Sequence, residues 1–91
     1  RIWRAGCDDP KSLKPHDRSR FNIYLLQLFN MFESLFFQAQ QGAVDQAFFE
    51  AKAQTLRLVL SFPGVREWWD TLASRNLDYR FREFVTRDLL R

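Results

Sequence analysis

The segment FNIYLLQLFNMFESLFFQAQQG, residues 21–42, decides the fold of this 91-residue chain. Apolar side chains recur in it at alternating spacings of four and three residues, which is the period of an α-helix with one buried face. The positions that carry this pattern are Phe21, Leu25, Leu28, Phe32, Leu35 and Ala39. Pro15 suits a first helical turn and Gly42 suits the position after a last one. The pattern therefore predicts a helix over residues 15–41.

The apolar residues of this segment divide between two faces of the predicted helix. At about 100° per residue, most of them fall within one broad half. These are Phe21, Tyr24, Leu25, Leu28, Phe29, Met31, Phe32, Leu35, Phe36 and Ala39. Ile23, Leu26 and Phe37 instead share a strip on the opposite, otherwise polar half. Scattered exposed apolar residues are ordinary, but three on one strip predict an interface with a protein partner or with a second copy of the chain.

A short connection, GAV, links the long helix to a second one. Asp45 is a good N-cap residue, and the residues after it predict a helix over about residues 46–60. Its inner stripe contains Phe49, Ala53, Leu56 and Leu60. Because the link is so short, we expect the two helices to form an antiparallel hairpin.

The stretch SFPG, residues 61–64, ends the second helix and starts a third. Ser61 can cap, and Pro63 can open, a short helix that reaches Ala73 and lies across the hairpin. Asp78 then caps a fourth helix that continues to the end of the chain. Its inward-facing residues are Phe81, Phe84, Val85 and Leu89.

The first fourteen residues lack a sustained period. We interpret residues 1–14 as the end of a preceding helix, capped near Gly6, followed by a loop with a turn at Asp9. Residues 15–91 then form the helical domain. No alternating run of β-branched residues favours a strand. The prediction is an all-α fold, a compact bundle of about four helices with a long central first helix and a short crosswise third helix.

The composition favours a packed aromatic core. Ten Phe, three Trp and two Tyr stand beside only three Gly and three Pro, and aromatic side chains bury the most area per residue. The single Cys excludes an intrachain disulfide and favours a reducing, cytoplasmic setting. The most apolar stretch, residues 21–44, is interrupted by Asn and Gln, so we expect a core helix and not a membrane span.

Trp68 and Trp69 stand side by side in the third predicted helix, shortly after Pro63. Adjacent helical residues point about 100° apart, so both rings can be buried only where the core surrounds this helix on two sides. We expect both to be core residues, one between the first two helices and the other against the fourth. In the alternative, one of the two rings anchors a partner, because Trp is frequent among interface hot spots.

Residues that could bind a metal or act as a nucleophile are few. Cys7, Asp8, Asp9 and His16 lie close together in the sequence, but the chain has no second Cys or His to complete a zinc site. A lone pair of aspartates also supplies too few oxygen ligands for a hard cation. We interpret the four residues as part of a polar loop and expect no metal or cofactor.

The acidic residues are spread over separate helices, whereas acid–base catalysis needs carboxylates that converge. Glu33 is the only charged residue in residues 21–44, and we expect it to be exposed or ion-paired. Glu83 and Arg87, like Arg66 and Asp70, are spaced as ordinary i,i+4 surface pairs. No catalytic residue is assigned, and we expect the chain not to be an enzyme.

The net charge of +3 is compatible with binding to nucleic acid but does not predict it. A helix-turn-helix reading would make residues 64–74 the recognition helix. That helix offers two indoles, Glu67 and Asp70, with Arg66 as its only basic residue. Recognition helices present basic and amide side chains to base edges, so we expect no nucleic-acid partner.

Three motifs together resemble a family of uncharacterised bacterial proteins. They are IWRAG..DP at residues 2–10, FE..FFQ...G at residues 32–42 and PGVREWW at residues 63–69. The resemblance implies an N-terminal membrane helix, then a long helix, then a helical cytoplasmic region with these motifs. It carries over no catalytic residue. The chain departs from the family at Phe48, Phe49 and Lys52, where relatives tend to carry Trp, and at Lys14-Pro15-His16, where they favour Ser/Thr-Pro-Glu.

These features predict a non-enzymatic interaction or scaffold domain. The resemblance adds the expectation that it is the cytoplasmic part of a protein tethered to the bacterial inner membrane through a missing N-terminal segment. The strip of Ile23, Leu26 and Phe37 would then dock that segment or a second copy. The alternative is a domain that binds a small apolar ligand in an aromatic pocket beside Trp68 or Trp69.

Overall fold

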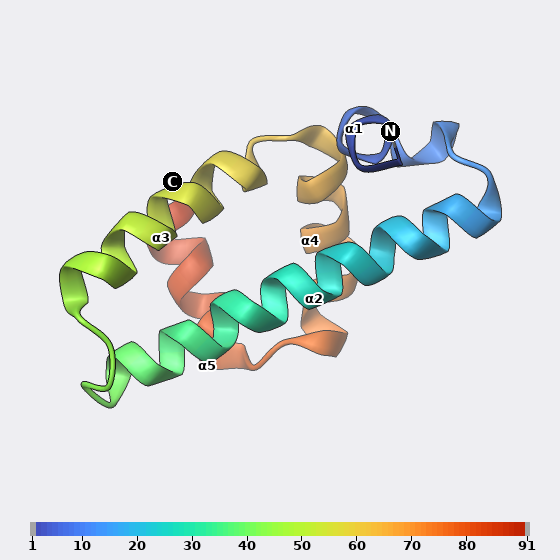
Figure 1. Ribbon diagram of the computed structural model, residues 1–91. Coiled ribbons are helices and arrows are strands. Elements are labelled where there is room, and N and C mark those ends of the chain that lie inside the picture. The colour runs from blue at the N-terminus through green and yellow to red at the C-terminus, as the bar shows by residue number, and fades with distance from the viewer. Residues whose placement is uncertain (1, 91) are drawn as a thin grey trace.

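The computed structural model describes residues 2–90, and every regular element within them is helical (Figure 1). The elements in chain order are α1 (Ile2–Asp8), η1 (Pro10–Ser12), α2 (Pro15–Gln40), α3 (Gln46–Leu60), α4 (Pro63–Asn76), α5 (Tyr79–Phe84) and η2 (Val85–Leu89). Here η1 is a 3₁₀ turn and η2 is a π-helical turn that extends α5. The prediction of an all-α fold is confirmed. The count of about four helices is wrong, because the segment before Pro15 contributes a helix of its own.

Helices α2 and α3 form the expected antiparallel hairpin (Figure 1). Helix α2 begins at Pro15 without a side-chain N-cap, and Gly42 after its end has a φ of 75°. That left-handed conformation suits glycine. The Asp45 carboxylate accepts a hydrogen bond of 3.0 Å from the backbone N–H of Phe48 and so caps α3. These predicted helix ends are confirmed.

We expect Asp45→Ala to lower the free energy of unfolding by about 1 kcal/mol. The substitution removes the side-chain acceptor at the start of α3 and leaves the Phe48 N–H without it. Urea denaturation measures the change. Asp45→Asn keeps an accepting oxygen, so its free energy of unfolding should stay close to that of the wild type. Equal losses of stability in Asp45→Ala and Asp45→Asn would show that Asp45 does not stabilise α3 as an N-cap.

The prediction that Ser61 caps the third helix is wrong. Ser61 has helical dihedral angles, and its hydroxyl donates a hydrogen bond of 2.5 Å to the carbonyl of Leu58, so it closes the end of α3. The N-cap of α4 is Phe62, which is extended because it precedes Pro63. Helix α4 also continues to Asn76 instead of ending at Ala73.

The centre of the core is an aromatic cluster between α2 and α4. Trp68 and Trp69 are only 4% and 7% exposed, and both contact Phe29 of α2. The Trp68 ring stacks on Phe29 with a centroid distance of 5.0 Å and an interplanar angle of 4°. The Trp69 ring lies 5.4 Å from Phe29 and meets Phe81 of α5 edge-on at 6.3 Å. Helix α4 is thus covered on two sides, which confirms that both indoles are core residues.

Helices α1 and α4 touch through their backbones at Gly6 and Gly64. A Cβ atom on Gly64 would overlap the carbonyl oxygen of Gly6, and one on Gly6 would overlap the ring of Phe21. Gly6 is therefore not a helix cap, as the sequence suggested, but a buried residue inside α1. The IWRAG and PGVREWW stretches, far apart in the sequence, meet at this contact.

Candidate functional site

The predicted strip on α2 is not a continuous exposed surface. Ile23 is 52% exposed, whereas Leu26 and Phe37 are partly buried against the core. The guanidinium of Arg80 covers the ring of Phe37 at 4.7 Å from its centroid. Helix α5 packs on this side of α2, and a helical angle alone cannot reveal such a cover. Of the three residues, only Ile23 is open to a partner.

Glu33 holds the start of α5 against α2. Its carboxylate is partly buried and accepts a hydrogen bond of 2.6 Å from the backbone N–H of Asp78, 45 residues away. A negative charge is favourable there because the first N–H groups of a helix lack partners within it. The expectation that Glu33 is exposed or ion-paired is wrong.

We expect Glu33→Ala to lower the free energy of unfolding by about 2 kcal/mol, because it removes a charged acceptor from a partly buried N–H. Glu33→Gln retains an accepting oxygen and should lose less. The matched control is Glu50→Ala, at an exposed position of α3. If thermal and urea unfolding gave the Glu33→Ala and Glu50→Ala variants the same stability, the hydrogen bond from the Asp78 N–H to Glu33 would not contribute to the stability of the fold.

An open apolar groove lies between α2 and α3, with a volume of about 530 Å³. We call it the α2–α3 groove. Its lining residues are Leu28, Met31, Phe32, Ser34, Leu35, Gln38, Phe48, Lys52, Thr55 and Val59. Met31 is 58% exposed and Phe48 is 49% exposed. Lys52 is the only charged residue of the lining, and its ammonium lies 5.2 Å from the centroid of the Phe48 ring.

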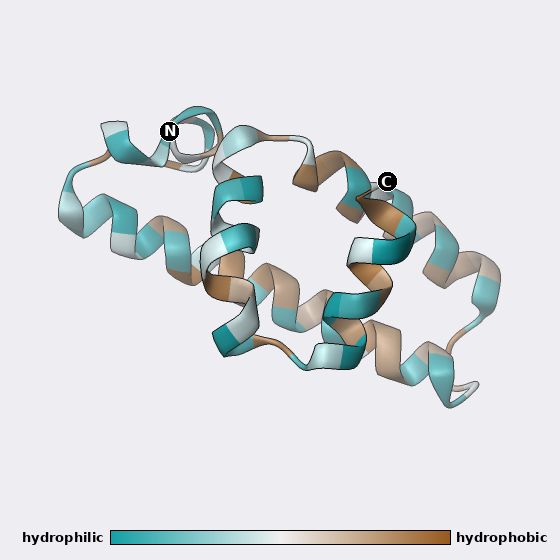
Figure 2. Cartoon of the chain, turned by 180° about the vertical axis from the view of Figure 1, so that it is seen from behind, coloured by the Kyte–Doolittle hydropathy of each residue, from teal (hydrophilic) through white to brown (hydrophobic). Residues whose placement is uncertain are grey.

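The α2–α3 groove does not follow from the apolar pattern, because the face of α2 predicted to be buried is wider than the face that is buried. The buried residues of α2 are Phe21, Leu25, Phe29, Phe32 and Phe36, which form a single narrow stripe. Tyr24 and Met31, predicted on the buried half, are exposed. The sequence did contain evidence for an exposed apolar edge. The apolar half of α2 is wider than the stripe that neighbouring helices cover, so apolar residues at the edge of that half remain exposed. Hydrophobic residues recur along both α2 and α3 in Figure 2.

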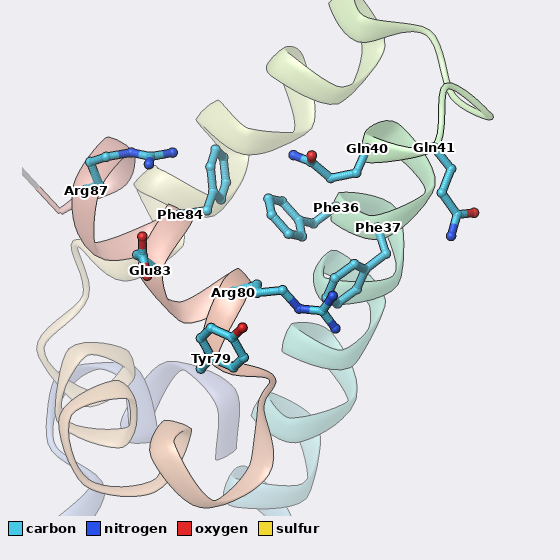
Figure 3. A pocket seen from close by; sticks show the side chains of 9 residues that line it. All are labelled: Phe36, Phe37, Gln40, Gln41, Tyr79, Arg80, Glu83, Phe84 and Arg87. Carbon is cyan, nitrogen blue, oxygen red and sulfur yellow. The ribbon is translucent and has the colours of Figure 1, made fainter.

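A second cavity, of about 510 Å³, lies between the end of α2 and the segment formed by α5 and η2 (Figure 3). We call it the α2–α5 cavity. Its lining residues are Phe36, Phe37, Gln40, Gln41, Tyr79, Arg80, Glu83, Phe84 and Arg87. Neither Trp68 nor Trp69 lines this cavity or the α2–α3 groove. The alternative function expects an aromatic pocket beside the indoles, and neither of these two cavities provides one there.

The two arginines of the α2–α5 cavity are each paired with an aspartate. Arg80 donates from Nε and Nη2 to the carboxylate of Asp78 at 3.1 and 3.0 Å, and these hydrogen bonds lower the pKa of Asp78. Arg87 donates from the same atoms to Asp88, at 3.2 Å each. The predicted i,i+4 pair of Arg87 with Glu83 is wrong.

The segment that carries Arg87 is the π-helical turn η2. The N–H of Leu90 donates to the carbonyl of Val85 at 3.0 Å, a spacing of five residues. Here Arg87 pairs with its neighbour Asp88 at 3.2 Å. In α4, which is a regular helix, the predicted pair of Arg66 and Asp70 is confirmed at 3.2 Å.

The residues weighed as metal ligands do not gather. Cys7 is buried in α1, so its assignment to a polar loop is wrong, and burial together with the neighbouring Asp8 raises the pKa of its thiol. Asp9 caps η1 by accepting from the backbone N–H of Lys11, and His16 is exposed. Within residues 2–90, no three Cys, His, Asp or Glu side chains are grouped as metal ligands.

In the part of the chain that the structure describes, no helix combines the length and the apolar character needed to cross a membrane. Comparison of the chain with protein-family models, with curated proteins and with solved structures finds no match.

Proposed function

We propose that this chain is a non-enzymatic scaffold domain that associates with a second copy of itself through the α2–α3 groove. The observation that carries the proposal is the exposure of Met31 and Phe48 in an almost uncharged lining. Exposed apolar patches of this kind mark interaction sites on soluble domains.

The charge distribution permits a second copy as the occupant of the α2–α3 groove. The chain has a net charge of +3, so two copies repel each other over most orientations. The α2–α3 groove presents Lys52 as its only charge, and Lys52 can turn its ammonium outward past Phe48. This face is consequently one on which two equally charged copies can meet at little electrostatic cost.

The shape of the hairpin supports the same occupant. A two-fold axis would place the α2–α3 hairpins of two copies face to face, and two such hairpins make a four-helix arrangement. Leu28, Met31 and Leu35 of α2 follow the i, i+3, i+7 spacing with which helices interlock. Ser34, Gln38 and Thr55 add uncharged polar groups to the lining.

The test compares Met31→Lys with Ile23→Lys by sedimentation velocity over a wide range of protein concentrations. The two positions lie on the same helix and are similarly exposed, at 58% and 52%, but only Met31 lines the groove. Neither variant should change the stability of the isolated chain by more than about 0.5 kcal/mol. Met31→Lys should weaken the dimer by on the order of a hundredfold, since it places like charges together in the interface.

Ile23→Lys should leave the dimer intact. A wild-type chain that stays monomeric at every concentration would overturn the proposal, and so would a dimer that Ile23→Lys breaks while Met31→Lys does not. The second outcome would restore the strip predicted from helical angles.

The IWRAG and PGVREWW stretches support a further proposal, that the scaffold lies on the cytoplasmic side of the bacterial inner membrane, held there by a segment that precedes α1. Fractionation of the full-length protein after alkaline washing tests it. Retention in the membrane pellet is expected, and release into the wash would contradict the tether without affecting the dimer.

A further inference from the structure

The net charge of the chain is concentrated in its first twenty residues. Residues 1–20 contain six basic and three acidic residues, whereas residues 21–91 contain eight of each. The whole net charge of +3 therefore belongs to residues 1–20, and the rest of the chain is neutral. A charge asymmetry of this kind indicates a partner that carries negative charge.

The basic residues of this stretch lie together at one end of the fold. Helix α1 and the turn η1 contact each other, and both contact α2. With the start of α2 they form one end of a molecule that measures 42 Å along its longest axis and 22 Å across it (Figure 1). We call the exposed cations of these elements the basic end, and they are Arg4, Lys11, Lys14, Arg18 and Arg20.

Ion pairs do not neutralise the basic end. Within residues 2–90, the ion pairs join Arg66, Arg80 and Arg87 to nearby aspartates, and none of them includes a cation of the basic end. Arg20 donates from Nη2 to the hydroxyl of Tyr24 at 3.3 Å, which leaves its charge in place. The charges of the basic end are therefore available to an anionic partner.

Two of the three acidic residues in the same stretch serve the helix starts. The Asp9 carboxylate accepts a hydrogen bond of 3.1 Å from the backbone N–H of Lys11 and so caps η1. Asp17 is partly buried in the first turn of α2, where the helix dipole favours a negative charge. Residues 2–20 still contain five basic against three acidic side chains, so a positive surplus remains.

The basic end also carries an exposed indole. The ring of Trp3 lies 5.8 Å from the buried ring of Phe21, measured between centroids, and Trp3 is nevertheless 38% exposed. The other two indoles of the chain are core residues. Trp and Tyr are enriched where lipid headgroups meet the hydrocarbon of a bilayer, because their rings have an apolar body and a polar edge.

We infer that the basic end docks on the surface of a bilayer that contains anionic lipids. The cations would lie over the negatively charged headgroups, and the exposed edge of Trp3 would lie at their level. A Lys or Arg close to such a surface strengthens binding about fivefold. The inference rests neither on the proposed dimer, whose groove shares no residue with the basic end, nor on the proposed tether.

A bilayer fits the arrangement of these cations better than a nucleic acid does. The phosphates of a duplex lie along two fixed lines, and proteins that bind single strands line a basic groove with stacking rings. The cations of the basic end instead come from three elements that surround one end of the molecule. Lipid headgroups can rearrange beneath any such distribution of charge, and the one exposed indole is held against Phe21.

The experiment is co-sedimentation of the chain with vesicles of phosphatidylcholine that contain phosphatidylglycerol, and with vesicles of phosphatidylcholine alone. Binding is expected to the first vesicles only, and it should weaken as salt is added, because salt screens exposed charges. Lys14→Gln/Arg18→Gln should weaken binding about twentyfold. The matched control, Arg66→Gln/Arg75→Gln, removes the same charge from exposed positions of α4 and should weaken binding far less.

Tryptophan emission tests the place of Trp3. With the phosphatidylglycerol vesicles, the emission of the wild type should move to shorter wavelength as the Trp3 ring leaves water. Trp3→Phe should still bind these vesicles, because its cations are unchanged, but it should lose the shift. Circular dichroism checks that each variant keeps the helical fold.

Four results would overturn the inference. The first is no binding to phosphatidylglycerol vesicles at low salt, or equal binding to both kinds of vesicle. The second is equal weakening by the two double substitutions, and the third is an emission shift that persists in Trp3→Phe. The fourth is binding to a DNA duplex in a mobility-shift assay without binding to vesicles, which would assign the basic end to nucleic acid. None of these results bears on dimerisation or, since the 91-residue chain is used without a preceding segment, on the tether.

Discussion

Replacing Gly64 with alanine should lower the free energy of unfolding by about 3 kcal/mol or more. The new Cβ atom would overlap the backbone carbonyl of Gly6, which cannot move aside as a flexible side chain could. Helices α1 and α4 would have to separate, and the contacts of Phe21 with α1 would be disturbed with them. Urea denaturation followed by circular dichroism measures the loss.

Gly42→Ala is the matched control for this substitution. Gly42 has a φ of 75°, but nothing lies within 4 Å of the position of its Cβ atom. The alanine there should cost only the roughly 1–2 kcal/mol of a left-handed residue. If Gly42→Ala proved as destabilising as Gly64→Ala, conformational strain and not the contact of two backbones would explain both.

Cys7 gives an independent measurement of the same contact. It is the single thiol of the chain, lies in α1 and is 3% exposed, and burial raises its pKa. At neutral pH it should therefore react slowly with a thiol reagent in the wild type. Gly64→Ala should accelerate the reaction under native conditions, before the other helices unfold, because α1 would leave its place. Unchanged reactivity would contradict the separation of α1 from α4.

Phe29→Ala should cost about 3–5 kcal/mol, which is the range for removing a fully buried aromatic side chain. Phe29 is 0% exposed and contacts Trp68 and Trp69, so the alanine leaves a cavity that both indoles border. Their fluorescence should change together with the stability. Phe29→Leu fills part of the space and should lose less.

Met31→Ala is the control for Phe29→Ala, since it truncates a large apolar side chain two residues further along the same helix. Met31 is mostly exposed in the isolated chain, and its loss should stay within about 0.5 kcal/mol at concentrations where the chain is monomeric. Comparable losses for the two variants, measured by thermal unfolding, would mean that the buried face of α2 is not the one described.

Features that depend on a few neighbouring residues were predictable from the sequence. Asp45 caps α3, Gly42 follows α2 and Pro15 opens it, because capping and backbone preference act within one turn. Ser61 shows the limit of such signals. A serine between two helices can close the first or open the second. Here Phe62, which is extended before Pro63, is the N-cap of α4, and Ser61 closes α3.

Features that arise from contacts between distant residues were not predictable in the same way. Gly6 resembles a helix cap in isolation, and only the approach of Gly64 explains why it lies inside α1. The carboxylate of Glu33 looks like a surface charge until α5 brings the N–H of Asp78 to it. At the candidate interaction surface, helical angles alone are wrong about Phe37, which Arg80 covers, and about Met31, which is 58% exposed.

Acrylamide quenching of tryptophan fluorescence in the Trp3→Phe variant, repeated over a wide range of protein concentrations, tests whether a single chain buries both indoles. Trp68 and Trp69 are then the only tryptophans, and we expect weak quenching that is the same at low and at high protein concentration. Strong quenching in dilute solution that disappears as the chains associate would show that the indoles are the interface, and that the core described between α2, α4 and α5 is not formed by one chain alone.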